Sequence, residues 1–130
     1  MLTTNSIGVV EYRIVETGLI KARYTSSEPK QLGCTQVLTG EARGDTSNGF
    51  PGTYNVRYLG ADGTINGDFD WEIVEDGEIL RLYWRSRPGT VPLVEGESVL
   101  VLEGFGFRNS ETSIVVTYWV VPEFLEMRGN

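Results

Sequence analysis

The chain has 130 residues, of which 18 are acidic and 11 basic, so its net charge is −7. It contains no histidine and one cysteine, Cys34, which excludes an internal disulfide, a histidine-based catalytic triad and a zinc site built from the usual ligands. The acidic balance and the scattered basic residues disfavour nucleic acid as a partner. We predict a single domain over residues 1–130 with no metal and no cofactor.

The sequence also carries no sign of a membrane or secretory segment. No apolar run approaches the roughly 20 residues that a membrane-spanning helix needs. The first residues lack the basic region and the long apolar stretch of a signal peptide. We therefore predict a cytoplasmic protein without membrane partners, in which Cys34 is a buried and unreactive thiol.

Alternation of apolar and polar residues with a period of two, the pattern of half-buried strands, begins close to the N-terminus. Val10, Tyr12 and Ile14 alternate with charged residues up to a turn at residues 17–18. A return strand is predicted from residue 19 to residue 24. The two segments together predict an antiparallel hairpin.

A glycine-rich segment, Gly40 to Gly52, follows a third apolar stretch at residues 36–39. We interpret it as a long loop between two strands. Loops of this length often border binding sites, so one hypothesis places the segment at the entrance of a pocket.

The clearest pattern lies between residues 53 and 85. Three runs alternate there between large apolar and polar residues: Tyr54 to Tyr58, Phe69 to Ile73 and Leu80 to Trp84. Asp-Gly pairs at 62–63 and 76–77 separate them, and glycine tolerates the positive φ that tight hairpin turns require. This region predicts a three-stranded meander whose rings point inward, with Asp68, Asp70 and Glu72 on a solvated outer face.

Two later segments, 98–107 and 114–121, are apolar on both faces and are predicted as strands joined by a turn at 108–110. Strands with this composition are covered on both sides. One cover is the core, and the other is a second subunit, a terminal segment or a helix. We expect a homodimer. Residues 123–127 form a short helical turn or lie along the surface.

About eight strands with short connections favour an antiparallel meander closed into a barrel, because closure removes exposed strand edges. A two-sheet β-sandwich is the alternative, since it uses the same alternation. The interior of an eight-stranded barrel is either filled by side chains or holds one small ligand.

If the alternation holds, one set of aromatic residues shares the inner face with Phe69 and Leu82. We identify six of them as candidate ligand-binding residues: Tyr12, Tyr54, Tyr58, Trp71, Trp84 and Tyr118. Rings with polar tips suit a small apolar or aromatic ligand that hydroxyl and indole groups orient. The alternative, that these rings only fill the core, stays open.

The order of the hairpins carries a resemblance to a known group of barrels. It rests on Gly-Thr-Tyr-Asn-Val-Arg-Tyr at 52–58, Asp-Gly-Thr at 62–64, Trp-Glu-Ile at 71–73 and Leu-Arg-Leu-Tyr-Trp at 80–84. In this form the chain resembles the calycin group of lipocalins, fatty-acid-binding proteins and avidins, and is similar also to allene oxide cyclase-like barrels. The lipocalin Gly-x-Trp motif is absent, because Gly8 is followed by Val9 and Val10. The resemblance implies a barrel with one open end and a small apolar ligand.

Three hypotheses of function follow. The first is a barrel that binds a small, partly apolar ligand in its aromatic interior. The second, implied by the likeness to the cyclase barrels, is a cofactor-independent isomerase or cyclase with a group such as Glu41 or Tyr54 inside the cavity. The third is a structural or assembly module without a ligand, whose partner surface lies on segments 98–107 and 114–121.

Overall fold

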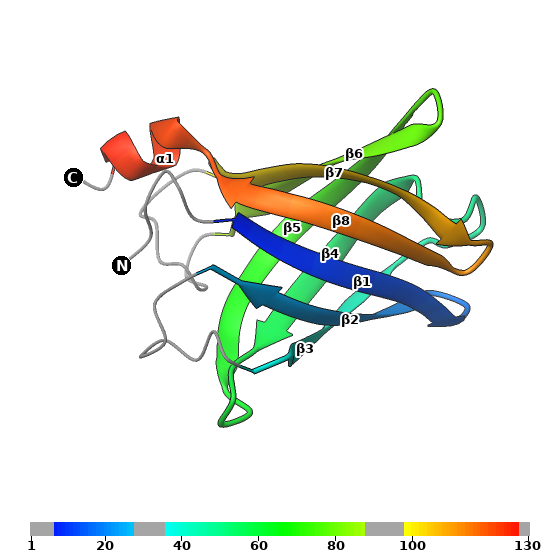
Figure 1. Cartoon of the computed structure of the whole chain (residues 1–130), viewed down its shortest axis with the longest axis horizontal. Coiled ribbons are helices and arrows are strands. Elements are labelled where there is room, and N and C mark those ends of the chain that lie inside the picture. Colours follow the sequence, from blue (N-terminus) through cyan, green and yellow to red (C-terminus); the bar gives the residue numbers. More distant parts are fainter. Residues whose placement is uncertain (1–6, 28–35, 88–97, 128–130) are drawn as a thin grey trace.

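The computed structural model describes residues 7–27, 36–87 and 98–127, and within them it forms a closed barrel. The strands are β1 (Ile7–Glu16), β2 (Leu19–Ser26), β3 (Leu38–Gly44), β4 (Gly52–Leu59), β5 (Ile65–Asp76), β6 (Ile79–Ser86), β7 (Leu100–Ser110) and β8 (Ser113–Val120), followed by helix α1 (Pro122–Met127). Each strand pairs antiparallel with the next, and β1 also pairs with β8 (Figure 1). The barrel prediction is confirmed, and the sandwich alternative is wrong.

The two ends of the barrel differ in what connects the strands. At one end, which we call the hairpin end, β1 joins β2, β3 joins β4, β5 joins β6 and β7 joins β8. At the other, the helix end, β1 begins and β8 leads into α1 (Figure 1). Closure runs along β1 and β8 from the pair Ile7 and Trp119 to the pair Arg13 and Ser113.

The two Asp-Gly pairs form turns as predicted. Gly63 has a φ of 83° between β4 and β5, and Gly77 has a φ of 66° between β5 and β6. A side chain at these positions strains the backbone, which explains why glycine stands there. The predicted three-stranded meander is thereby confirmed as β4, β5 and β6.

The segment from Gly40 to Gly52 is only partly a loop. Its first five residues belong to β3, and the loop covers residues 45–51. The inward positions of β3 are Gly40, Ala42 and Gly44, which pair with the inward Tyr58, Val56 and Tyr54 of β4. The sequence predicted the start of this strand in the apolar stretch at residues 36–39, but its continuation to Gly44 was missed because the core-facing residues are too small to give an apolar period.

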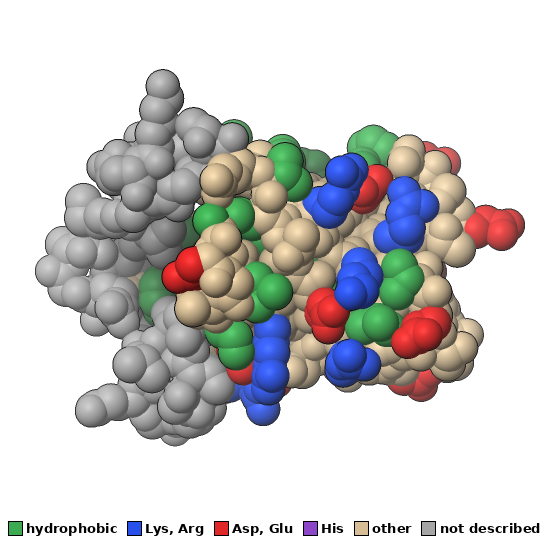
Figure 2. Space-filling view, turned by 90° about the horizontal axis from the view of Figure 1, so that it is seen from below, with side chains coloured by type: hydrophobic (Ala, Val, Ile, Leu, Met, Phe, Trp, Pro, Cys, Tyr) green, Lys and Arg blue, Asp and Glu red, His purple; other side chains and the backbone are tan. Residues whose placement is uncertain are grey.

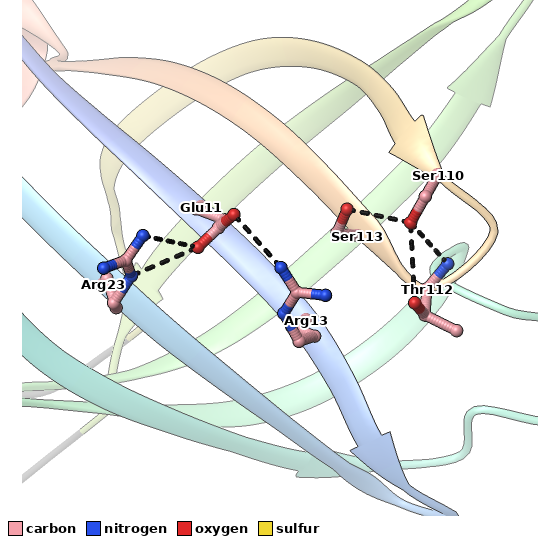
Figure 3. Close-up of polar contacts among 6 residues, drawn as sticks. All are labelled: Glu11, Arg13, Arg23, Ser110, Thr112 and Ser113. Atoms are coloured by element: carbon pink, nitrogen blue, oxygen red, sulfur yellow. Dashed lines mark hydrogen bonds and ion pairs between the residues drawn. The ribbon is translucent and has the colours of Figure 1, made fainter.

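The turn between the last two strands also differs from the predicted position. Strand β7 continues to Ser110, and the turn lies at residues 111–112 instead of 108–110. The Ser110 hydroxyl accepts a hydrogen bond from the Thr112 backbone N–H at 3.2 Å and lies 3.0 Å from the Ser113 hydroxyl (Figure 3). Polar residues at the end of β7 resemble a turn in sequence, but here they extend the hairpin.

The register between Tyr54 and Trp84 agrees with the prediction. Trp71 and Trp84 are each 1% exposed, whereas Asp70 and Arg81 lie on the exposed outer face. The inner faces of all eight strands meet in one apolar core, in which Tyr12, Val56, Leu80, Leu82 and Ile114 are nearly inaccessible to solvent.

Inward glycines make room for these rings. A Cβ atom on Gly8 would lie 2.0 Å from the ring of Tyr118, and one on Gly40 would lie 2.8 Å from the ring of Tyr58. On Gly44 a Cβ would lie 2.6 Å from the ring of Tyr54. The rings therefore lie across neighbouring strands, over positions that have no side chain.

The outer surface mixes acidic and basic side chains, which Figure 2 shows close together on one face. One predicted feature of this surface is wrong: Asp68 is 5% exposed and does not belong to a solvated face. Its carboxylate accepts a hydrogen bond from Asn55 at 2.8 Å and pairs with Arg57 at 3.3 Å and Arg87 at 3.0 Å. Two guanidinium groups and an amide cover it, because a buried carboxylate needs such partners.

Helix α1 confirms the predicted helical turn near the C-terminus, and its Phe124 is buried in the core. Within the part of the chain that the structure describes, no helix has the length and apolar character needed to cross a membrane. Cys34, and the proline-containing link with Pro88 and Pro92, lie outside the described residues.

Candidate ligand-binding site

A pocket of about 320 Å³ lies at the helix end of the barrel. The lining residues that the structure describes are mostly apolar or aromatic: Ile7, Tyr24, Ser26, Tyr58, Asn66, Gly67, Phe69, Trp84, Val101, Leu102, Tyr118, Trp119 and Val120. Ile7, Ser26 and Val120 are terminal residues of β1, β2 and β8 at this end, which places the mouth of the pocket there. A concave, mainly apolar site with a few polar groups is the usual form of a small-molecule site.

Three polar tips meet beneath this pocket. The hydroxyl groups of Tyr12 and Tyr58 lie 2.6 Å apart, and the indole Nε1–H of Trp84 donates to the Tyr58 hydroxyl at 2.7 Å. The three residues come from β1, β4 and β6, so the contacts join strands that are not neighbours. Tyr58 and Trp84 line the pocket, whereas Tyr12 lies below them, at 1% exposure.

The phenol groups of this cluster are held neutral. Burial raises the pKa of Tyr12 well above its ordinary value, and the neighbouring Tyr58 adds to that rise. Burial also raises the pKa of Tyr58, although the hydrogen bonds with Tyr12 and Trp84 oppose the rise. Both groups therefore act as neutral hydroxyls, able to donate and to accept hydrogen bonds.

The wall of the pocket on β2 and β5 carries further polar groups. The Tyr24 hydroxyl donates to the Leu59 carbonyl at 2.9 Å and accepts a longer contact from the Asn66 amide at 3.4 Å. The ring of Tyr24 meets that of Tyr58 edge-on, with centroids 5.2 Å apart. Tyr24 is thus fixed by contacts at both its ring and its hydroxyl.

Trp71 lies deeper, in a stack of rings. Its ring centroid is 4.6 Å from that of Tyr12, 5.3 Å from that of Tyr54 and 6.1 Å from that of Trp84. Its indole Nε1 is buried without a hydrogen-bond partner. The middle of the barrel is therefore filled by side chains, and the pocket lies above this layer.

The six predicted residues divide into three groups. Tyr58, Trp84 and Tyr118 line the pocket. Tyr12 and Trp71 form the layer beneath it, in contact with the lining residues. Tyr54 lies toward the hairpin end, where its hydroxyl donates to the backbone carbonyls of Gly49 and Phe50.

Several lining residues were missed in the sequence, Tyr24 and Asn66 among them. The alternation of inward and outward residues along β2 could have identified Tyr24, because it falls on the same face as the inward Ile20 and Ala22. Asn66 gave no signal, since it stands at the start of β5 beside a turn and its position depends on how the barrel closes.

The loop at residues 45–51 closes the hairpin end and does not border this pocket. Phe50 is 1% exposed and belongs to the core, and its carbonyl accepts a hydrogen bond from Tyr54 at 2.9 Å. The hypothesis that the glycine-rich segment forms the pocket entrance is therefore wrong for this pocket. Sequence alternation did not detect Phe50 as a core residue, because it lies in a loop.

Glu41 lies outside the barrel interior. It is on the outer face of β3, where its carboxylate accepts a hydrogen bond from Lys21 at 2.7 Å, and this bond lowers the pKa of Glu41. It does not supply the interior acid that the cyclase hypothesis needs. Among the described residues no three acidic, histidine or cysteine side chains gather as a metal site would require.

In comparisons with protein-family models, with curated proteins and with solved structures, nothing matches this chain. The closed eight-stranded meander is compatible with the calycin architecture.

Proposed function

We propose that this protein is a calycin-like barrel that binds a small, mainly apolar molecule in the pocket at the helix end. The observation that carries the proposal is the pocket of about 320 Å³ above a fully packed aromatic layer. A barrel built only for stability has no need of such a volume, because filling it with larger apolar side chains would bury more apolar surface.

The lining also suits a ligand with a flat ring. Tyr58, Trp84 and Phe69 present aromatic surface, and Val101, Leu102 and Val120 present aliphatic surface. The hydrogen bonds and ring contacts of Tyr24 and Tyr58 fix their side chains before any ligand enters. A preorganised site of this kind loses little conformational entropy on binding.

The test is a titration with isopropenylnaphthalene, a neutral aromatic hydrocarbon, followed by the indole N–H signals in NMR spectra. We expect saturable binding that shifts the Trp84 signal. Val120→Phe adds a ring to the pocket and should weaken binding at least about tenfold, whereas Val74→Phe, on the exposed face of β5, should leave it unchanged. Absence of saturable binding to the wild type, both of this hydrocarbon and of its ketone analogue acetylnaphthalene, would overturn the proposal.

A second proposal concerns the outer face of β7, β8 and β1, which lie side by side (Figure 1). Apolar side chains gather there in what we call the outer strip: Ile7, Val9, Phe105, Phe107, Val115 and Trp119. Phe107 is 57% exposed and Val9 is 55% exposed. A hollow of about 480 Å³ borders four of the six strip residues and extends to Arg23 and Tyr24 of β2. We propose that a second copy of this chain covers the strip.

The charged groups beside the strip have partners within the chain, so a second copy that covers the strip leaves none of them without a partner. On the β2 side, Arg23 and Arg13 both pair with Glu11, at 3.1 Å and 3.4 Å (Figure 3). On the β7 side, Glu103 accepts a hydrogen bond from the Trp119 indole at 3.1 Å. A two-fold axis in the interface lays the apolar strip of one copy on that of the other, as a self-complementary interface requires.

Analytical ultracentrifugation between about 10 and 500 µM tests this assembly. We expect reversible dimers, which Phe107→Lys abolishes and which Val74→Lys, on the far side of the barrel, leaves intact. A monomer at every concentration would overturn the second proposal and leave the first one standing.

A further inference from the structure

A count of hydrogen-bond donors in the layer beneath the pocket leaves one hydrogen without an acceptor. The Tyr12 hydroxyl, the Tyr58 hydroxyl and the Trp84 indole carry three donor hydrogens, and they form two hydrogen bonds with one another. The indole only donates, so its bond uses an acceptor site of the Tyr58 oxygen. The remaining hydrogen belongs to one of the two tyrosines, depending on which of them donates across their 2.6 Å contact.

The surroundings decide between the two arrangements. If Tyr58 donates to Tyr12, the hydrogen of Tyr12 is left over at a side chain that is 1% exposed and does not line the pocket. If Tyr12 donates to Tyr58, the leftover hydrogen belongs to Tyr58, which is 8% exposed and lines the pocket. A buried donor without an acceptor is costly, so the second arrangement is favoured, because whatever occupies the pocket can accept that hydrogen.

The charge of the pocket lining also restricts which ligands can bind. Among the lining residues that the structure describes, none is acidic or basic. An anionic ligand would lose its hydration without gaining a cationic partner there, and a cationic ligand would find no carboxylate. The uncharged polar groups on this lining include the hydroxyls of Ser26, Tyr24, Tyr58 and Tyr118 and the Asn66 amide. The Tyr24 hydrogen is already donated to the Leu59 carbonyl, whereas the arrangement above leaves the Tyr58 hydrogen without an acceptor in the cluster.

Resting on the proposed function, we infer that the ligand is a neutral apolar molecule whose inner end carries an uncharged hydrogen-bond acceptor, such as a ketone, aldehyde or ester carbonyl. Tyr58 donates its hydroxyl hydrogen to that oxygen. Because the Tyr58 oxygen already accepts two hydrogen bonds, from Tyr12 and from Trp84, its own hydrogen becomes a better donor.

Three naphthalenes substituted at the same ring position test the inference by calorimetric and NMR titration at pH 7. Acetylnaphthalene has a carbonyl oxygen, isopropenylnaphthalene replaces that oxygen by a CH₂ group of the same shape, and naphthoate carries a negative charge. We expect the ketone to bind about tenfold more tightly than the alkene and about tenfold more tightly than the carboxylate.

The variant Tyr58→Phe should bring the ketone and the alkene to within about twofold of each other. The control Tyr83→Phe removes a hydroxyl from the outer face of β6 and should preserve the preference. If Tyr58→Phe folds poorly, the affinities of the wild-type protein for the ketone and the alkene still test the inference. With a ¹³C-labelled carbonyl, the bound ketone should show the downfield shift of a carbonyl that accepts a hydrogen bond.

The outcomes separate this inference from the proposed function. If none of the three probes binds, the ligand-binding function itself fails. If the alkene binds as tightly as the ketone, or the labelled carbonyl does not shift, the pocket stands and the role of Tyr58 is overturned. If naphthoate binds most tightly, the requirement for a neutral ligand is wrong.

Discussion

At the scale of single residues, Tyr58 connects the core to the pocket. Its ring lies over Gly40 and meets the ring of Tyr24, while its hydroxyl joins Tyr12 and Trp84. Tyr12 has one hydrogen bond in this cluster, whereas Tyr58 has two. Removing the Tyr58 hydroxyl therefore deprives two groups of a hydrogen-bond partner, whereas removing the Tyr12 hydroxyl deprives one.

We expect Tyr58→Phe to lower the free energy of unfolding by about 1–3 kcal/mol, because it leaves the Trp84 indole and the Tyr12 hydroxyl without their acceptor. Tyr12→Phe should cost about 1 kcal/mol, since the bond between Trp84 and Tyr58 remains. Urea denaturation of both variants measures the difference. Equal losses would show that Tyr58 is not the centre of the cluster.

At the scale of elements, the backbone of β8 leaves no room for side chains at two inward positions of β7. A Cβ atom on Gly106 would lie 2.0 Å from the backbone carbonyl oxygen of Val115, and one on Gly104 would lie 2.3 Å from that of Thr117. At Gly8 the obstacle at 2.0 Å is instead the far end of the Tyr118 side chain. The same distance thus has different consequences, because a ring can rotate and a paired backbone cannot.

Gly106→Ala should therefore destabilise the protein by about 3 kcal/mol or more, since the cross-strand pairing must open to admit the methyl group. Gly8→Ala should cost about 1 kcal/mol and should also weaken ligand binding, because the displaced Tyr118 ring lines the pocket. Thermal or urea unfolding of the two variants, with a titration of the second, checks both statements. A larger loss of stability in Gly8→Ala than in Gly106→Ala would contradict this account.

The glycines and aromatic rings also explain which parts of the fold could be predicted from the sequence. The large residues of β4, β5 and β6 carry a clear period of two, so their register and the burial of Trp71 and Trp84 followed from the sequence. The part of β3 beyond residue 39 was read as a loop, because its inward residues, Gly40, Ala42 and Gly44, are too small to give an apolar period. Alternation assigns a side chain to a face but not to a depth, so it could not separate the buried Tyr12 from the pocket-lining Tyr58.

At the scale of the whole molecule, one core contains several neutral phenols, and this makes stability depend on alkaline pH. Burial raises the pKa of Tyr12 and of Tyr58, and burial together with the charge of Asp45 raises the pKa of Tyr54 to about 12. In the unfolded chain these groups ionise near pH 10. Between pH 10 and the pKa values of the folded state, the folded protein holds protons that the unfolded chain has released.

The contribution of these neutral phenols to the free energy of unfolding is therefore fully present below about pH 10. It is lost as the pH rises through their raised pKa values. Each shifted phenol contributes a slope of about 1.4 kcal/mol per pH unit between its two pKa values. Urea denaturation from pH 8 to pH 12 should show a constant free energy at first and then a steep fall. In Tyr54→Phe the fall between pH 10 and pH 12 should be shallower by about one such slope, because one of the protons is no longer linked to folding. The same steepness in the variant and the wild type would mean that Tyr54 does not ionise at a higher pH in the folded protein than in the unfolded chain.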